Sequence, residues 1–124
     1  MKQSRASYAS PDRKLAVVCA VSKQYSRAGR LWYWFAFHPH QRDFLQTADD
    51  GYVAFGCGSE KTLVLIPRDT FTRWLDGMNK TEQEDRFYWH VHIFRNGDRI
   101  SLYRSRGVAE VDLTEFLLSE PRVA

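Results

Sequence analysis

Cysteine is scarce in this chain of 124 residues, and the two that it has do not form a motif. Cys19 lies within the apolar run LAVVCAV, and Cys57 stands between two glycines. Their spacing matches neither a zinc ribbon nor a disulfide framework. The sequence therefore predicts two reduced thiols, the usual state in the cytoplasm.

Long hydrophobic runs and phosphate-binding loops are missing as well. No apolar segment approaches the roughly 20 residues that a membrane-spanning helix needs, so we expect no membrane partner. No glycine-rich loop ends in Lys-Ser or Lys-Thr, which argues against a nucleoside triphosphatase. A composition of 44% hydrophobic and 15% aromatic residues suits one compact domain, and the chain is too short for a second.

Acidic residues are nearly absent from the first 30 positions. This segment has seven Lys or Arg residues and only Asp12, whereas residues 31–124 carry a net charge of −3. Residues 1–13 have the composition of a basic, flexible leader ahead of a domain over residues 14–124. Because positive charge attracts phosphates, we expect contacts to nucleic acid here, with a solvated tail as the alternative. The candidate residues are Lys14, Lys23, Arg27 and Arg30.

Apolar and alternating segments predict the strands of a sheet. The sequence Asn96-Gly97 is typical of a tight hairpin turn, so the segments on either side of it should pair antiparallel. Near the C-terminus we expect a short strand and a helical turn, with Asp112 or Thr114 as its cap. The main expected strands cover residues 14–23, 31–38, 52–58, 62–67, 87–94 and 99–105.

Two segments predict helices. Pro39 suits the first turn of a helix whose apolar stripe is Phe44, Leu45 and Ala48. A second helix should start near Pro67, because Phe71, Trp74, Leu75 and Met78 recur at helical spacing. The sequence thus predicts a single α+β domain with a mixed, twisted sheet of about five to six strands, two packed helices and a C-terminal β-hairpin.

All four histidines fall into two His-x-His pairs, each at an aromatic, strand-like segment. Side chains at positions i and i+2 of a strand share a face, so two neighbouring strands could offer several nitrogen ligands to one divalent metal ion. Pro39 separates one pair, and its two side chains could diverge; partly buried or surface histidines are therefore the competing interpretation. The candidate metal ligands are His38, His40, His90 and His92.

The order of elements over residues 14–80 resembles the second half of the restriction-endonuclease-like, PD-(D/E)XK, nuclease core. The resemblance rests on a strand ending in Lys23, a basic loop, an aromatic strand, a helix, and the segment DDGYVAFGCGSEKTLVLIP. It implies an association with nucleic acid. In that family an acidic residue two positions before the lysine helps to hold Mg²⁺, but here the matching residue is Val21, which supplies no oxygen ligand.

The sequence therefore favours a non-catalytic or degenerate nuclease-like domain, without a cofactor, that binds nucleic acid or belongs to a nucleic-acid-processing assembly. Two alternatives stay open. One is a metal-dependent enzyme that uses the His-x-His pairs. The other is a protein-interaction module whose excess of Trp and Tyr reflects a partner surface. The chain could also be a fragment of a larger nuclease-like protein.

Overall fold

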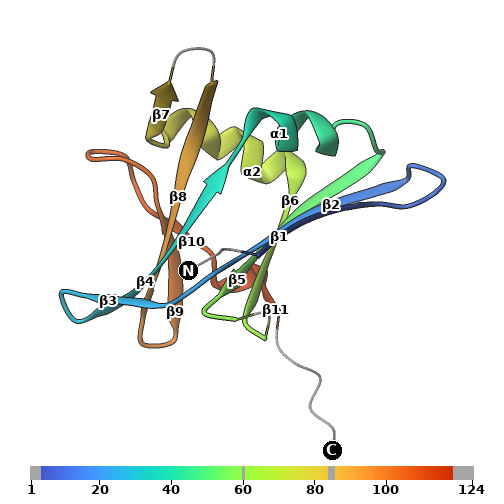
Figure 1. The fold of residues 1–124 in the computed structure, drawn as a ribbon. Coiled ribbons are helices and arrows are strands. Elements are labelled where there is room, and N and C mark those ends of the chain that lie inside the picture. Colours follow the sequence, from blue (N-terminus) through green and yellow to red (C-terminus); the bar gives the residue numbers. More distant parts are fainter. Residues whose placement is uncertain (1–3, 60, 84–85, 119–124) are drawn as a thin grey trace, which may run out of the picture.

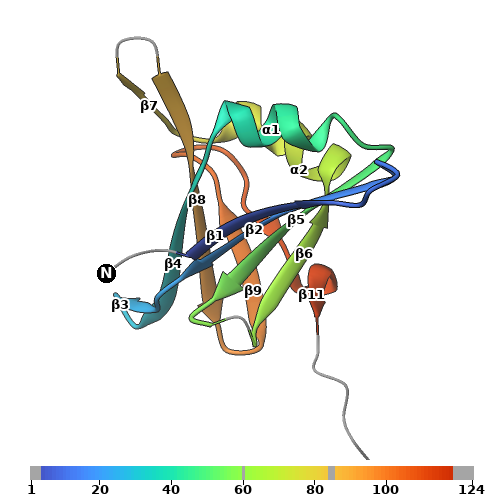
Figure 2. The ribbon, with the colours of Figure 1, turned by 45° about the vertical axis from the view of Figure 1, so that its right-hand side comes forward.

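A computed structural model describes residues 4–59, 61–83 and 86–118 of the chain. In this part, 11 strands form two sheets, and two short helices lie over one end of both sheets (Figures 1 and 2). The architecture confirms the predicted single α+β domain. It differs from the sequence expectation in one respect, because the strands are divided between two sheets and do not form one.

The first sheet has five strands in the order β1-β2-β5-β6-β11. β2 and β5 are parallel, with Val18 opposite Val53, and the other neighbours are antiparallel. The strands are β1 (Ser4–Ala9), β2 (Leu15–Ser22), β5 (Asp50–Cys57), β6 (Leu63–Pro67) and β11 (Leu117–Leu118).

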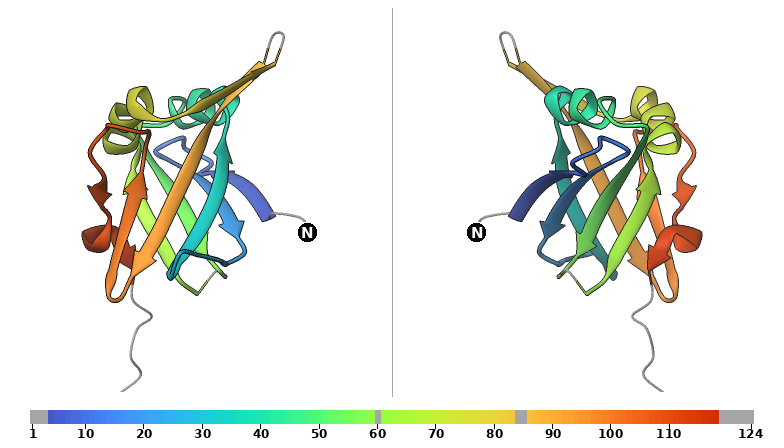
Figure 3. Two further views of the ribbon diagram at one scale, coloured as in Figure 1. Left: turned by 90° about the vertical axis from the view of Figure 1, so that its left-hand side faces the viewer. Right: turned by 90° about the vertical axis from the view of Figure 1, so that its right-hand side faces the viewer.

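The second sheet has six strands and is antiparallel throughout. Its order is β10-β9-β8-β4-β3, and β7 pairs with a further part of the long strand β8. The ends of β7 and β8 extend beyond the helices (Figure 3). The strands are β3 (Tyr25–Arg27), β4 (Arg30–Phe37), β7 (Lys80–Gln83), β8 (Arg86–Asn96), β9 (Arg99–Tyr103) and β10 (Val111–Asp112).

The core lies between the two sheets and is closed at one end by the helices. Alternation along the strands sends every second side chain inward, as for Phe35 of β4 and Phe55 of β5, whose ring centroids are 4.6 Å apart. Phe71 of α2 (Arg68–Trp74) is fully buried beneath the helix and contacts both Phe37 and Phe55. Burying an aromatic or branched side chain is worth about 1.5–3 kcal/mol, so this layer dominates stability.

The first helix, α1 (Pro39–Leu45), begins and ends as its residues dictate. At its start the Gln41 side chain accepts a hydrogen bond from the backbone N–H of His38, and Pro39 occupies the first turn. At its end the Arg68 guanidinium donates to the carbonyl oxygens of Leu45 and Ala48, at 2.8 and 2.9 Å. Arg68 therefore joins the beginning of α2 to the end of α1.

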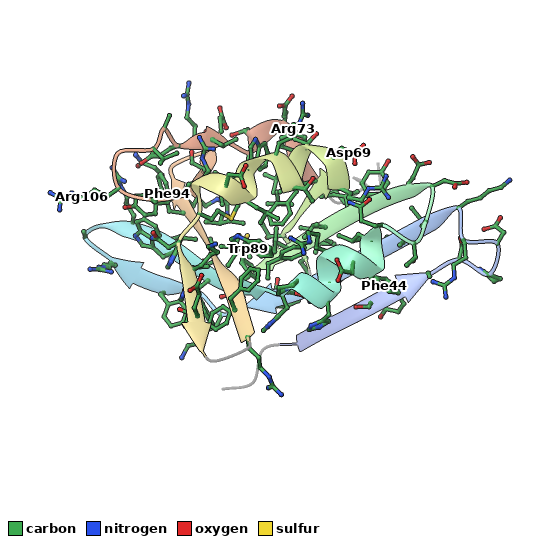
Figure 4. The ribbon with its side chains drawn as sticks, turned by 90° about the horizontal axis from the view of Figure 1, so that it is seen from above. Phe44, Asp69, Arg73, Trp89, Phe94 and Arg106 are labelled. Carbon is green, nitrogen blue, oxygen red and sulfur yellow. The ribbon has the colours of Figure 1, made fainter. Side chains whose placement is uncertain are left out.

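The second helix is extended by a 3-10 turn over Leu75–Gly77, and a further 3-10 turn spans Thr114–Phe116. Asp112 accepts from the backbone N–H of Thr114 at 2.9 Å, but Leu113 occupies the cap position and makes no side-chain cap hydrogen bond, so neither Asp112 nor Thr114 is the cap that the sequence predicts. Seen from above, Asp69 and Arg73 lie on the outward side of α2 (Figure 4). Neither helix in the described part of the chain is long and apolar enough to cross a membrane.

The predicted flexible leader over residues 1–13 differs from the structure. Within it, Ser4–Ala9 forms β1 and pairs with β2 along its whole length, from Ser4 opposite Val21 to Ala9 opposite Ala16. The physical reason is that β2 has backbone hydrogen-bonding groups on both edges, and β5 satisfies only one of them. The composition of residues 1–13 alone does not show that the second edge of β2 needs a pairing partner. Residues 1–3 lie outside the described residues.

In two smaller respects the structure also differs from what the local sequence predicts. The charged segment after α2 has the composition of a loop, but Lys80–Gln83 forms β7, since the extended end of β8 offers it a hydrogen-bonding edge. The β8–β9 hairpin is confirmed, with its turn one residue later than Asn96-Gly97 predicts. Asn96 pairs with Arg99, so Gly97 and Asp98 are the central turn residues, and Gly97 has the positive φ of 63°.

Candidate functional site

The outer side of the six-stranded sheet is covered by aromatic rings. In β4 the alternation that buries Tyr33, Phe35 and Phe37 turns Trp32 and Trp34 to this outer side. The pairing of β4 with β8 then places Phe94 opposite Trp32 and His92 opposite Trp34. We call this surface the aromatic face, and it consists of Trp32, Trp34, Tyr88, His90, His92, Phe94 and Tyr103.

The rings of the aromatic face form one connected group. The Trp32 ring lies 4.9 Å from Phe94 and 6.3 Å from Tyr103, measured between centroids. His92 lies 6.3 Å from Tyr103 and stacks at 5.8 Å on His90. Because neighbouring rings support one another, this surface offers rigid, preorganised flat groups to a ligand.

The β3–β4 hairpin brings basic side chains to one end of the aromatic face. Its two-residue turn is Ala28-Gly29, with φ of 53° and 75°, the pattern of a type I′ turn. The resulting register puts Tyr25 opposite Trp32 and Arg27 opposite Arg30. The hairpin lies away from the helical end of the molecule (Figure 1).

A pocket of about 840 Å³ lies where this hairpin meets the aromatic face, and we call it the hairpin pocket. Its size is within the range of small-molecule sites. Five of its ten lining residues are aromatic, and none of them is acidic. The lining residues are Tyr25, Ser26, Arg27, Ala28, Arg30, Trp32, Tyr33, Trp34, His92 and Tyr103.

Arg27 and Arg30 give the pocket its charge. Both side chains are exposed, and like charges in directly opposite positions of two strands repel each other. The guanidinium of Arg30 lies 5.1 Å from the Phe94 ring centroid, but within the described ranges neither arginine has a carboxylate partner. Two adjacent cations without a counter-charge favour an anionic ligand.

His92 is a lining residue of the hairpin pocket whose side chain can change its protonation state. Burial lowers the pKa of its imidazole below the ordinary 6.5, and the nearby His90 and Arg27 lower the pKa further, so the ring is neutral at pH 7. It makes ring contacts, but no hydrogen bond joins it to another described residue. A neutral imidazole has one donor and one acceptor nitrogen, so His92 can offer both to a ligand.

Tyr33 closes the pocket from the core side. Its hydroxyl donates to Gln24 Oε1 at 2.9 Å. Burial raises the pKa of this hydroxyl, and the positive charge of Arg95 acts in the opposite direction. Arg95 is therefore a third cationic side chain close to this wall.

The structure places the two His-x-His pairs in one row. His38 and His40 stack at 5.2 Å, and Tyr88 stands between this pair and the other, 5.5 Å from His38 and 5.0 Å from His90. Within the part of the chain that the structure describes, no three His, Cys, Asp or Glu side chains are close enough to hold a metal ion together. The predicted histidine metal site remains a prediction without support from this geometry.

The four predicted phosphate-binding residues are divided between two places. Arg27 and Arg30 line the hairpin pocket, and Lys23 lies next to it with its Nζ 5.0 Å from the Tyr25 ring centroid. Lys14 is at the other end of β2, roughly 25–30 Å away by the rise of a strand, where its carbonyl accepts from the N–H of Asp50. Charge alone could not separate Lys14 from the others.

Sequence reasoning missed the aromatic half of the site. The apolar character of both faces of residues 31–38 predicts a strand buried on both sides, with Trp32 and Trp34 inside. Both are only half-buried. Tyr25 and Tyr103 gave no signal, since only the register of β3, β4, β8 and β9 brings them to the pocket. The sequence signal that could have indicated these residues is a strand in which Trp alternates with smaller aromatic residues, next to a basic turn.

Comparison with known proteins found no family model, no curated protein and no solved structure that matches this chain. The site must therefore be interpreted from its own geometry.

Proposed function

We propose that this domain binds nucleic acid, with the aromatic face as a stacking surface for unpaired bases and the β3–β4 hairpin as the contact to phosphates. The observation that carries the proposal is the hairpin pocket, in which aromatic rings and two arginines occur together without an acidic lining residue. Proteins that bind single strands combine the same two elements, a positively charged groove and rings on which bases stack.

Other ligand classes fit this surface less well. An aromatic cage for an alkylated ammonium group needs a neutral or acidic rim, but Arg27 and Arg30 repel cations. A duplex presents paired bases whose faces are already covered, so it could use the arginines but not the rings. Unpaired nucleotides use both parts of the site.

We propose binding without cleavage. Phosphodiester hydrolysis of the nuclease type requires carboxylates that hold Mg²⁺. Val21, at the position where the resemblance requires an acid, pairs with Gly56 near the ends of β2 and β5 and offers no ligand. The pocket has no acidic lining residue either.

The test is fluorescence anisotropy with labelled 15-nucleotide single strands of DNA and RNA, and the matched duplex, at several salt concentrations. We expect single strands to bind more tightly than the duplex, and log K to fall with log salt. The variant Arg27→Ala/Arg30→Ala should reduce that slope by about 0.7 for each phosphate that the protein no longer binds.

The control is Arg73→Ala, which removes an exposed positive charge from the outward side of α2 (Figure 4). It should leave both affinity and slope unchanged. No binding at low salt, or an equal effect of the hairpin and α2 substitutions, would contradict the proposal.

A further inference from the structure

We infer that the hairpin pocket holds one nucleotide whose base has left its stack, with the base between aromatic rings and against His92 and its phosphate at Arg27 and Arg30. This inference rests on the proposed function and narrows it. A flat stacking surface would bind any stretch of single strand, whereas this site would select one extrahelical base.

The shape of the site is the first argument. The rest of the aromatic face is filled by rings that contact one another, and Phe94 is only 4% exposed because Trp32 and Arg30 cover it. Next to them, residues of the hairpin and of the sheet line a space of about 840 Å³. A continuous strand needs an open track, but a local hollow of this size receives a single group.

The walls of the hollow are the second argument. Tyr25, 43% exposed, stands on the hairpin, and Trp34 and Tyr103 stand on the sheet. Rings therefore approach the space from two different elements. A planar base placed between them gains stacking on more than one side, which a sugar or an aliphatic chain does not.

His92 supplies the third argument, because it can read the edge of the base. It lines the pocket, it is neutral at pH 7, and both of its ring nitrogens are free of hydrogen bonds to the described residues. A base edge presents donors and acceptors side by side, which one neutral imidazole can match. Half-buried polar groups without a protein partner are typically satisfied by a ligand or by water.

The placement of charge completes the site. Arg27 and Arg30 are exposed and lie opposite each other beside the turn, while the sheet residues Trp34, His92 and Tyr103 are half-buried. A nucleotide has the same polarity, with an anionic phosphate at one end and a flat apolar base at the other. The base enters the pocket, and the phosphate stays at the solvent-exposed arginines.

The experiment compares three 15-base-pair duplexes, made in DNA and in RNA. One is fully paired, one has a single central bulged nucleotide, and one has the same bulge with an abasic sugar in place of the nucleotide. We expect the bulged duplex to bind about 5- to 150-fold more tightly than the other two, since stacking of one base contributes about 1–3 kcal/mol. The abasic bulge, which interrupts the duplex at the same place but offers no base, should bind like the paired one.

Two substitutions in the pocket and one matched control sharpen the test. Tyr25→Ala should abolish most of the preference for the bulged base, whereas Tyr8→Ala, which removes a tyrosine that is 62% exposed on the other sheet, should not. His92→Phe keeps a ring of similar shape and removes the hydrogen bonds. It should reduce discrimination among the four bulged bases more than it reduces the affinity itself.

The outcomes separate this inference from the proposed function. Equal binding of the two bulged duplexes, together with loss of affinity in Arg27→Ala/Arg30→Ala, would overturn the base pocket and leave nucleic-acid binding in place. No binding of any single strand or duplex would overturn both. Equal effects of Tyr25→Ala and Tyr8→Ala would also overturn the base pocket, because the ring at the hairpin would then have no special role.

Discussion

The indole N–H of Trp34 donates a hydrogen bond to Nδ1 of His90, 3.0 Å away. An indole nitrogen is only a donor, so Nδ1 must be the acceptor, and the proton of the neutral imidazole is on Nε2. Nε2 in turn donates to Oγ1 of Thr81. Three strands, β4, β8 and β7, are thus linked by one chain of side-chain hydrogen bonds.

From these hydrogen bonds we expect purified protein to carry little metal. Both ring nitrogens of His90 are occupied by protein partners, so a metal ion would have to displace Trp34 or Thr81. Elemental analysis of protein without an affinity tag should find far less than one zinc, iron or nickel ion per chain. One ion per chain that is lost in His90→Ala/His92→Ala would contradict the expectation and restore the metal-dependent alternative.

Thr81 predicts a measurable loss of stability. Thr81→Val keeps the shape of the side chain and removes the acceptor of His90 Nε2, so the free energy of unfolding should fall by about 1 kcal/mol. Urea denaturation measures this value. Thr81→Ser retains the hydroxyl and should lose less. In the double variant Thr81→Val/His90→Phe the losses should not add, since both substitutions break the same hydrogen bond.

Cys57 predicts a loss of stability in alkaline solution. Burial raises the pKa of its thiol from the ordinary 9.0 to about 12. Above pH 9 the unfolded chain releases this proton and the folded chain keeps it, so the free energy of unfolding decreases from pH 9 towards pH 12. Cys57→Ala should show a shallower decrease in urea denaturation at pH 8–11, from a lower starting stability.

The same burial should make Cys57 unreactive. In native protein at pH 8 a maleimide or iodoacetamide should modify it only after unfolding, because the thiolate is the reactive form. Cys19 is half-buried, with a pKa that burial also raises, and serves as the internal comparison. Rapid native modification of Cys57 would contradict the structure.

His92 predicts the opposite pH dependence, on the acidic side. Burial, His90 and Arg27 lower its pKa. Below pH 6.5, the ordinary pKa of histidine, the unfolded chain therefore binds a proton at His92 more readily than the folded chain does. The free energy of unfolding therefore falls as the pH decreases through 6.5. His92→Phe should show a smaller decrease between pH 7.5 and pH 5. An NMR titration that gives His92 a pKa above 6.5 would contradict this.

Lys14 and Arg27 carry the same charge at different places. Substituting each in turn therefore tests whether the position of a positive charge or the net charge determines affinity. Arg27 lines the hairpin pocket, while Lys14 lies at the far end of β2. Arg27→Ala should weaken binding of a single-stranded 15-mer about tenfold, the cost of losing a charge-assisted hydrogen bond. Lys14→Ala should change it less than twofold. Equal losses would mean that net charge, and not the pocket, determines affinity.

Local patterns predicted most of the elements. An apolar run identified the strand around Phe35, and alternation identified the strand around Val91. The spacing of Phe71, Trp74 and Leu75 identified α2, and Asn96-Gly97 identified the hairpin to within one residue. Each of these signals lies within a few neighbouring positions. They are therefore strong enough to read without knowledge of the fold.

The assignment of strands to sheets could not be read in this way. Nothing local tells that β4 leaves its sequence neighbour β2 for another sheet, or that Ser4–Ala9 is needed at the free edge of β2. The candidate site has the same origin. Its basic half was predicted from charge, but Tyr25, His92 and Tyr103 come together only through the cross-strand register of the second sheet.

The parallel pairing of β2 with β5 has a consequence for the folding pathway. Between these strands the chain, residues 23–49, adds β3 and β4 to the opposite sheet and α1 to the end of the core. The central pair of the first sheet therefore closes a loop that contains two strands of the second sheet and α1. The strands of the two sheets alternate along the chain, and such long-range pairing is typical of slow folding. Backbone amides at the centres of both sheets should then exchange with solvent through the same global opening.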